Sequence, residues 1–279
     1  MTNEAQDLTL VVGGTGKTGR RVVDRLRTEG RPVRVGSRSG APPFDWGDRA
    51  TWAPAVGGAT GAYVSYFPDL AVPGAAEAVG EVARLAAAAG VQRLVLLSGR
   101  GEEEAQRAER LIRDAFPAAT VVRCSWFAQN FTESYLLEPV VAGEVALPAG
   151  DVPEPFVDAD DIADVATAAL TEDGHAGETY EVTGPRALTF AQAVEEIAAA
   201  SGREIAFVEV PMEAYAEAAR EDGVPSDVTD LLTYLFAEVL DGRNVAVTDG
   251  VQRALGRPPR DFAQFARHAA ATGIWDGTR

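Results

Sequence analysis

Short apolar runs alternate with longer amphipathic stretches through the first part of the chain. Five apolar runs have the length and composition of buried parallel strands, and they span 8–12, 32–36, 61–67, 91–97 and 120–123. Three stretches carry apolar residues at helical spacing and are followed by glycine or proline, and they span 18–29, 72–89 and 102–116. We also expect a short strand ending at 44–46 and a short helix at 49–56. The alternation predicts an α/β protein with a Rossmann-type, doubly wound parallel sheet.

The last third of the chain lacks this strand–helix repeat. It contains apolar helical faces and one alternating edge strand, and these span 189–201, 204–210, 212–220 and 226–240. We therefore expect a Rossmann domain at 1–185, with 124–154 contributing to its cleft, and a smaller α+β lobe at 186–279 that caps the substrate.

The net charge of the chain limits the classes of ligand that we expect it to bind. The chain has 279 residues and a formal net charge of −17. Nucleic acids and anionic membranes are bound by basic surfaces, so this charge argues against both. No apolar run approaches the length of a membrane helix, and the polar residues 1–7 do not resemble a secretory signal. We expect a cytoplasmic protein whose ligands are small molecules.

The residues that commonly bind metals point to no metal site. Cys124 is the only cysteine, which excludes an internal disulfide and a cysteine-based metal cluster, and we expect it to be a small buried residue. An acidic cluster at 158–164 lacks the spacing and glycine of a calcium-binding loop. We expect these acids to lie at the start of a helix, where negative charge is favourable.

A glycine-rich turn lies between the first strand and the first helix. Gly13, Gly16 and Gly19 have the spacing G-x-x-G-x-x-G, which allows a tight turn and a close approach of backbone to a pyrophosphate. A Walker A loop is excluded, because the glycine it needs upstream of Lys17 is absent. The residues expected to bind a dinucleotide here are Gly13, Gly14, Thr15, Gly16, Lys17, Thr18 and Gly19.

The end of the second strand indicates which dinucleotide is bound. An acidic residue there selects NAD through the ribose 2′-hydroxyl, but this chain has Ser37 and Arg38, and the next acid is Asp45. A guanidinium pairs well with a 2′-phosphate. We therefore favour NADP(H) over NAD(H), the alternative being that Arg38 is a solvated loop residue.

Further cofactor contacts are expected where later strands end, because the ligand crevice lies at the carboxyl ends of parallel strands. Packing is the alternative for each aromatic residue, and for Phe67 in particular. The additional candidates for the cofactor are Asp45, Trp46, Tyr66, Phe67, Ser98, Ser125, Trp126 and Phe127.

Five segments in this order resemble the NmrA-like branch of the atypical, extended short-chain dehydrogenase/reductase superfamily. The residues that carry the resemblance are the loop 13–19, the pair Leu97-Ser98, the stretch 123–131 with Cys124 where proline is usual, the segment 155–163, and 180–185 followed by 188–190. The resemblance covers most of the chain. It implies an NAD(P)-binding oxidoreductase, with Ser98 at the position of a superfamily serine.

The chain departs from the superfamily's usual catalytic device, a Tyr-x-x-x-Lys pair in which lysine lowers the pKa of tyrosine. Lys17 is the only lysine and lies in the glycine loop. In the helix that should carry the pair, Ala105 and Glu109 occupy the two positions. Reduction of a simple carbonyl by the usual acid is therefore not expected.

Three functions are compatible with these features. The first is hydride transfer from NADP(H) to a conjugated, electron-poor acceptor such as a quinone or a cationic dye, as in quinone and triphenylmethane reductases of this branch. Its catalytic candidates are Ser98, expected to hydrogen-bond a substrate oxygen, and Tyr135, and its substrate candidates are Trp126, Asn130, Phe131 and Tyr135. The alternative for Ser98 is a strand-end serine that satisfies local backbone groups. The second is a non-catalytic NADP(H) sensor that acts through a regulatory protein partner, and the third is a structural subunit with a vestigial site. A homodimer stays open.

Overall fold

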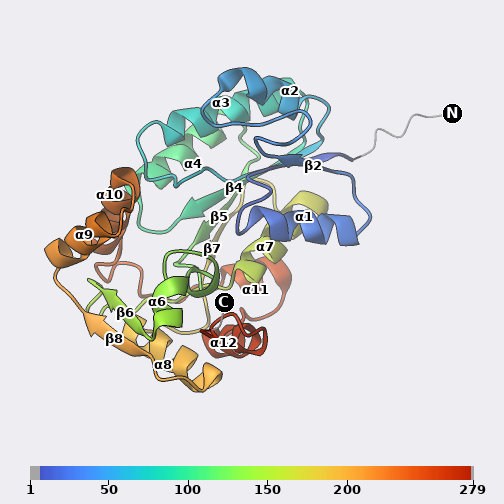
Figure 1. The fold of residues 1–279 in the computed structure, drawn as a ribbon. Helices are drawn as coiled ribbons and strands as arrows, with labels where there is room; N and C mark the ends of the chain where they lie inside the picture. The colour runs from blue at the N-terminus through green and yellow to red at the C-terminus, as the bar shows by residue number, and fades with distance from the viewer. Residues whose placement is uncertain (1–6, 278–279) are drawn as a thin grey trace. The chain divides into compact units, whose positions relative to one another are not determined.

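A six-stranded parallel sheet forms the centre of the first part of the chain (Figure 1). The computed structural model describes residues 7–277. The strands are β1 (Thr9–Val12), β2 (Val33–Gly36), β3 (Gly61–Val64), β4 (Arg93–Gly99), β5 (Thr120–Cys124) and β7 (Thr179–Val182). Their order in the sheet is β2-β1-β3-β4-β5-β7, with every pairing parallel. The predicted α/β, Rossmann-type sheet is confirmed.

Helices cover both faces of this sheet (Figure 1). One face carries α2 (Trp52–Val56), α3 (Ala75–Ala88) and α4 (Glu103–Ala115), and the other carries α1 (Gly19–Thr28), α7 (Ala159–Thr171) and α11 (Gly250–Leu255). The long helices bury alanine and branched aliphatic side chains against the strands. The sheet is therefore enclosed on both sides, which explains why β1 and β3 are buried at every position.

The expected strand ending at 44–46 is wrong. Asp45 forms only an isolated antiparallel bridge with Asp48, three residues later. A carboxylate oxygen of Asp45 accepts a hydrogen bond from the Gly47 nitrogen at 2.9 Å, and Asp48 caps a 3-10 turn at Arg49–Thr51. These aspartates satisfy nearby backbone groups and turn the chain before a strand can extend.

The chain divides into two compact units. Unit 1 consists of residues 7–124, 159–182 and 249–257, and unit 2 consists of residues 125–158, 183–248 and 258–277. Residues 249–257, which the sequence analysis assigned to the C-terminal lobe, pack with unit 1. Within residues 7–277, no helix is long and apolar enough to span a bilayer.

Unit 2 has a small parallel pair of strands and a set of helices. The strands are β6 (Glu144–Leu147) and β8 (Ala206–Glu209). The helices are α5 (Asn130–Glu133), α6 (Leu137–Ala142), α8 (Phe190–Ser201), α9 (Met212–Glu221), α10 (Ser226–Tyr234), which continues into a π-helical turn at Leu235–Val239, and α12 (Phe262–Ala271). An N-terminal capping box of Thr189 and Gln192 starts α8 at its predicted position.

Aromatic side chains form the core of unit 2. Phe190 lies 5.0 Å from Phe156, and Phe131 lies 5.7 Å from Phe262, measured between ring centroids. The indole nitrogen of the fully buried Trp275 donates a 2.8 Å hydrogen bond to the Phe131 carbonyl oxygen. Unit 2 thus has its own hydrophobic core, separate from that of the sheet.

Candidate functional site

The glycine loop packs tightly between β1 and α1. Gly13 has a φ of +71°, in the left-handed region that favours glycine, and its nitrogen donates a 3.0 Å hydrogen bond to the Gly36 carbonyl oxygen. A Cβ atom at Gly19 would overlap the backbone of Gly13. The first turn of α1 can therefore lie against the loop, which leaves backbone N–H groups at a helix N-terminus, the arrangement that binds phosphate.

Thr18 links the glycine loop to the strand β3 through a hydrogen bond. The buried Tyr63 hydroxyl, on β3, donates a 2.9 Å hydrogen bond to Thr18 Oγ1. Burial raises the pKa of Tyr63, so the hydroxyl keeps its proton. Further along the loop, the Lys17 carbonyl oxygen accepts a 2.7 Å bond from Arg21. Thr15 and Gly16 are exposed, so their backbone is accessible to a ligand.

The two residues proposed to select the nucleotide lie just beyond β2. The carbonyl oxygen of Ser37 accepts bonds from the nitrogens of Gly40 and Phe44, which fixes the turn. Arg38 is exposed, and its side chain makes no hydrogen bond or ion pair within the described part of the chain. Its guanidinium is therefore available for a phosphate, and its predicted role stays a prediction.

Four aromatic rings support the residues that follow β2 and β3. Trp46 packs against Tyr66 at 4.6 Å and Phe44 at 4.9 Å between ring centroids, and its indole nitrogen donates to the Ser65 carbonyl oxygen at 3.3 Å. The fourth ring, Trp52, is fully buried beneath them. Phe67, by contrast, is 77% exposed, which excludes the alternative that it is a core residue. The cofactor contacts of this cluster stay predictions.

Ser98 lies within β4, one residue before its end, and takes part in a buried network. Its hydroxyl donates a 2.6 Å hydrogen bond to Glu109 on α4. Glu109 also accepts bonds from Arg123 on β5, at 2.9 Å from Nε and 2.5 Å from Nη2. The third Arg123 nitrogen donates to Glu181 on β7 at 2.7 Å. The alternative that Ser98 satisfies local backbone is wrong, because its partner is a carboxylate from a neighbouring helix.

A second pair of acids lies next to this network. Asp69 and Glu102 share a side-chain hydrogen bond, and the Glu102 carboxyl lies over Gly99, where a Cβ atom would collide with it. Burial, and then the charge of Asp69, raise the pKa of Glu102 well above its ordinary value. The pair therefore holds a proton at pH values where exposed carboxyls have lost theirs.

Cys124 is buried at the end of β5, as expected. Burial, and then the charge of Glu102, raise the pKa of its thiol well above the usual value. A thiol that keeps its proton is a poor nucleophile, so Cys124 acts as a small buried residue.

In unit 2, the predicted substrate residues differ in accessibility. Phe131 was expected to contact substrate, and this is wrong, because it is 0% exposed and packs against other phenylalanines of the core. The helix α5 directs it inward. Trp126 is half-buried, with Phe190 at 5.3 Å and Phe236 at 5.1 Å. Ser125 is buried, and Phe127 and Asn130 are half-buried, so their roles stay predictions.

The Tyr135 hydroxyl is buried and has no hydrogen-bond partner among the described residues. Burial, and then the charge of Tyr215, raise its pKa well above the usual value. A hydroxyl with a raised pKa is a weak proton donor near neutral pH, although it remains a good hydrogen-bond donor. An unsatisfied hydroxyl of this kind is costly and suits a ligand that supplies an acceptor.

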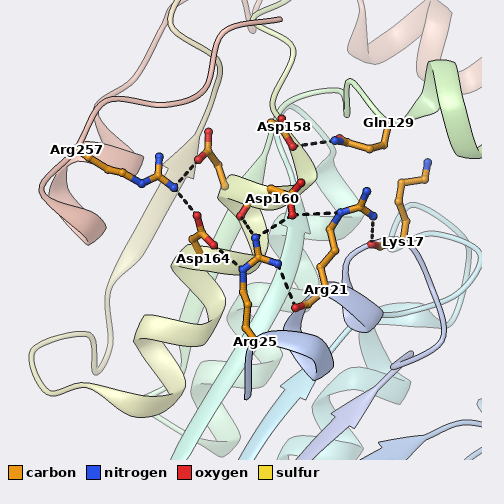
Figure 2. A network of polar contacts seen from close by, with 9 residues as sticks. Lys17, Arg21, Arg25, Gln129, Asp158, Asp160, Asp164 and Arg257 are labelled. Atoms are coloured by element: carbon orange, nitrogen blue, oxygen red, sulfur yellow. Dashed lines mark hydrogen bonds and ion pairs between the residues drawn. The ribbon is translucent and has the colours of Figure 1, made fainter. Parts of the chain in front are cut away.

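The acidic cluster at 158–164 is neutralised in large part by arginines. Arg25 on α1 lies between two aspartates of α7, with Nε 2.5 Å from Asp164 and Nη2 2.8 Å from Asp160 (Figure 2). Arg257 reaches Asp161 at 2.7 Å. The two contacts of Arg25 form an ionic clasp between α1 and α7, called here the clasp of Arg25, Asp160 and Asp164. Across residues 7–277, no group of three or more histidine, cysteine, aspartate or glutamate side chains is arranged to hold a metal ion.

No family model matches the chain, but individual proteins match along almost its whole length. An NAD(P)H azoreductase of Xenophilus azovorans is 31% identical, over 95% of this chain and 99% of its own length. An uncharacterized oxidoreductase of Bacillus subtilis, YesF, is also 31% identical, over 97% and 98%.

Three solved structures share the fold. The NADPH complex of the quinone oxidoreductase QOR2 from Escherichia coli has a TM-score of 0.78 and 22% identity, and covers 94% of this chain and 99% of that one. Triphenylmethane reductase from Citrobacter has a TM-score of 0.75 and 19% identity, covering 95% and 99%. The negative transcriptional regulator NmrA has a TM-score of 0.72 and 18% identity, covering 98% and 99%. The chain belongs to the NmrA-like family of atypical short-chain dehydrogenases/reductases.

Within this NmrA-like protein, the structure shows what occupies the two positions to which the resemblance assigned the catalytic pair. Ala105 is fully buried in α4 and offers no proton. Glu109 is also buried and is held by Arg123. At the position that the resemblance assigns to the lysine, the side chain is thus a buried carboxyl group paired with Arg123.

The hydrogen-bond and ion-pair partners of the candidate residues were not predicted from the sequence of this NmrA-like protein. Neither the Ser98–Glu109 bond nor the Asp69–Glu102 pair was expected. A signal for the first is present in hindsight, because Arg123 is a charged residue inside an otherwise apolar strand, and such a residue needs a counter-charge. For the second, the two acids lie in separate loops, and their spacing carries no signal.

Proposed function

We propose that this NmrA-like protein is an NADP(H)-dependent reductase that transfers hydride to a conjugated, electron-poor acceptor, quinone-like or dye-like, without a Tyr-Lys pair. The observation that carries the proposal is the tightly packed glycine loop of β1 and α1. It is supported by Ala105 and Glu109, which are buried and which the resemblance assigns to the positions of the usual proton donor and lysine. The site has the means to bind a dinucleotide but lacks the usual acid for a simple carbonyl.

The residues present fit a bound dinucleotide. The left-handed Gly13 and the close contact of Gly19 leave no side chain between the loop backbone and a pyrophosphate. When bound, NADP(H) supplies a hydride, that is, a proton with two electrons. The acceptor must then spread or neutralise the added charge, and water can supply any further proton. A conjugated or cationic acceptor meets this condition, whereas an isolated ketone does not.

NADP(H) is favoured over NAD(H) because of Ser37 and Arg38. Arg38 is exposed beyond β2 and has no partner among the described residues. Its planar guanidinium is suited to bidentate contact with a 2′-phosphate. No acid lies between β2 and Asp45, and Asp45 is occupied by its own turn. A ribose 2′-hydroxyl therefore lacks its usual carboxylate acceptor here.

Two residues of unit 2 suit a flat acceptor. Trp126 presents a half-buried indole, and such rings stack on conjugated systems. The Tyr135 hydroxyl would gain a partner from an acceptor atom of the substrate. Relatives named for azo compounds and triphenylmethane dyes, and a quinone oxidoreductase of the same fold, support a conjugated acceptor.

Turnover tests the proposal. The purified protein is mixed with NADPH, and absorbance loss is followed over a panel of quinones, cationic dyes, azo dyes and conjugated enones. We expect steady multiple turnover with at least one class and none with simple ketones. Tight NADPH binding without turnover on the whole panel would contradict the proposal and favour the NADP(H) sensor, for which NmrA offers a precedent of fold.

A further inference from the structure

The Ser98 hydroxyl has a defined direction. It is 4% exposed at the carboxyl end of β4, and its proton is donated to Glu109 across 2.6 Å. A serine hydroxyl has one proton to donate and lone pairs to accept with. With its proton committed to Glu109, the Ser98 oxygen can offer a ligand only an acceptor.

Glu109 is held as an acceptor by its own partners. It is 4% exposed, and Arg123 donates to both of its carboxylate oxygens. Arg123 is in turn fixed by Glu181. An ionised carboxylate cannot donate, so the hydrogen bond with Ser98 runs in one direction only. Because hydrogen bonds to a charged acceptor are roughly twice as strong as neutral ones, a neutral ligand oxygen competes poorly for the Ser98 proton.

We propose that Ser98 binds an N–H group of the ligand as a hydrogen-bond acceptor, and that Glu109 is the positioning residue that sets this polarity. The proposal rests on the proposed function and on the expectation that the ligand crevice lies at the carboxyl ends of the parallel strands, where Ser98 is located. It reverses the role first expected of Ser98, the hydrogen-bonding of a substrate oxygen. A carbonyl oxygen there would meet lone pairs with lone pairs, whereas an amide, amino or iminium N–H would meet an acceptor polarised by Glu109.

Two ligands could supply the N–H group, the nicotinamide carboxamide or the acceptor substrate. The first is tested by the affinity of wild type and Ser98→Ala for NADPH and for its 3-acetylpyridine analogue, which keeps the carbonyl oxygen and lacks the N–H. Wild type should prefer NADPH about five- to tenfold, the worth of one hydrogen bond. Ser98→Ala should bind the two within twofold of each other.

The second source is tested with matched acceptors, a quinone and the corresponding quinone imine. If the substrate supplies the N–H group, Ser98→Ala raises the ratio of KM for the imine to KM for the quinone about five- to tenfold. In that case, the ratio of the affinities for NADPH and its 3-acetylpyridine analogue is the same in wild type and in Ser98→Ala. The inference is overturned if neither pair depends on the N–H group, or if Ser98→Ala loses most activity on the quinone.

Glu109→Gln tests the positioning role. Glutamine replaces one carboxylate oxygen with an NH2 group and removes the negative charge, so the Ser98 hydroxyl loses its charged acceptor and is less firmly held as a donor. In Glu109→Gln, the preference for the ligand with the N–H group over its matched partner should fall to less than threefold. A purely structural defect would instead weaken the binding of both ligands of a pair equally. The control is Glu104→Gln, at a half-buried position of the same helix that pairs with Arg107, and it should change neither preference.

The two failures are distinguishable. If wild type neither binds nor oxidises NADPH, the proposed function fails. If it binds and oxidises NADPH but shows no dependence on an N–H group, only the assignment of Ser98 fails. Circular dichroism of each variant checks its fold, and Ser98→Ala alone decides the assignment if Glu109→Gln does not fold.

Discussion

The two units hold their candidate residues by different forces. In unit 1, Ser98 is held by a hydrogen bond to Glu109 and by the ion pair of Glu109 with Arg123. In unit 2, Trp126 is held by packing against Phe190 and Phe236. Hydrogen bonds fix which atom donates and which accepts, whereas ring packing fixes only shape. The support of Ser98 therefore depends on charge and hydrogen-bond direction, whereas the support of Trp126 depends on the fit of neighbouring rings.

This difference also explains which residues are misassigned from sequence. An aromatic residue in a loop after a strand has the same sequence pattern whether it packs inward or faces a ligand. Phe131 packs inward and is 0% exposed, whereas the ring of Phe67 is 77% exposed. Substituting each of the two residues by alanine should give the largest difference in stability that we expect.

Phe131→Ala should lower the free energy of unfolding by about 3–5 kcal/mol, because it removes a fully buried ring and leaves a cavity. Urea denaturation measures the change. The matched control is Phe67→Ala, which should alter stability by no more than about 0.5 kcal/mol because its ring is exposed. Equal losses for the two variants would show that unit 2 does not depend on this aromatic core.

Arg38→Ala should weaken NADPH binding about ten- to hundredfold and leave NADH binding nearly unchanged, because a charge-assisted contact to the 2′-phosphate is lost. Affinities from quenching of tryptophan fluorescence measure the effect. Equal losses of affinity for NADPH and NADH would contradict the assignment of Arg38 to the 2′-phosphate. Arg38 would then be a solvated loop residue.

Arg25→Ala should lower the free energy of unfolding by about 1 kcal/mol, because the clasp of Arg25, Asp160 and Asp164 is only partly buried and solvent screens it. Thermal unfolding at low and high salt checks this, with a smaller loss expected at high salt. Arg84→Ala, which breaks an exposed pair with Glu81 on α3, is the control and should show no measurable loss. A clasp variant as destabilised as Phe131→Ala would contradict the comparison between polar and aromatic supports.

Glu102→Gln should change the pH dependence of stability. The folded protein raises the pKa of Glu102, so the wild type gains stability that is present below the unfolded pKa and is lost as pH rises through the folded pKa. Glutamine cannot ionise, and its amide can still donate to Asp69. The melting temperature of the variant relative to wild type should therefore rise from pH 5 to pH 8. A constant difference across this range would mean that Glu102 ionises like an exposed acid.

Much of the fold follows from local patterns in the sequence. The first five strands of the main sheet, the helices α1, α3 and α4 and the glycine loop each have a signal within about fifteen residues, in apolar spacing or in a single glycine such as Gly19. The strand β7 and the helix α11 were not predicted from such a pattern. The turn at 44–48 was missed because aspartates that bond nearby backbone compete with strand formation. The strand β6 was missed because it is short and pairs with β8, about sixty residues later, and that pairing leaves no local pattern.

Less of the candidate site could be predicted, because its residues act through partners that are distant in sequence. Position alone indicated Ser98, but the direction of its hydrogen bond depends on Glu109 and Arg123. The inward direction of Phe131 likewise depends on Phe156, Phe190 and Phe262. A sequence pattern identifies where a strand ends, whereas the chemistry available there depends on tertiary contacts.

The hydrogen bond from Trp275 to the Phe131 carbonyl oxygen has a consequence for synthesis on the ribosome. The two residues are 144 positions apart, and Trp275 is fully buried in the core of unit 2. Five of the six strands of the main sheet, by contrast, lie within the first 124 residues. Chains emerge from the ribosome N-terminus first, so most of the sheet can assemble while unit 2 still lacks its last aromatic residue. The aromatic core of unit 2 therefore cannot be complete until Trp275 has left the ribosome, after most of the strands of the main sheet are already available to pair.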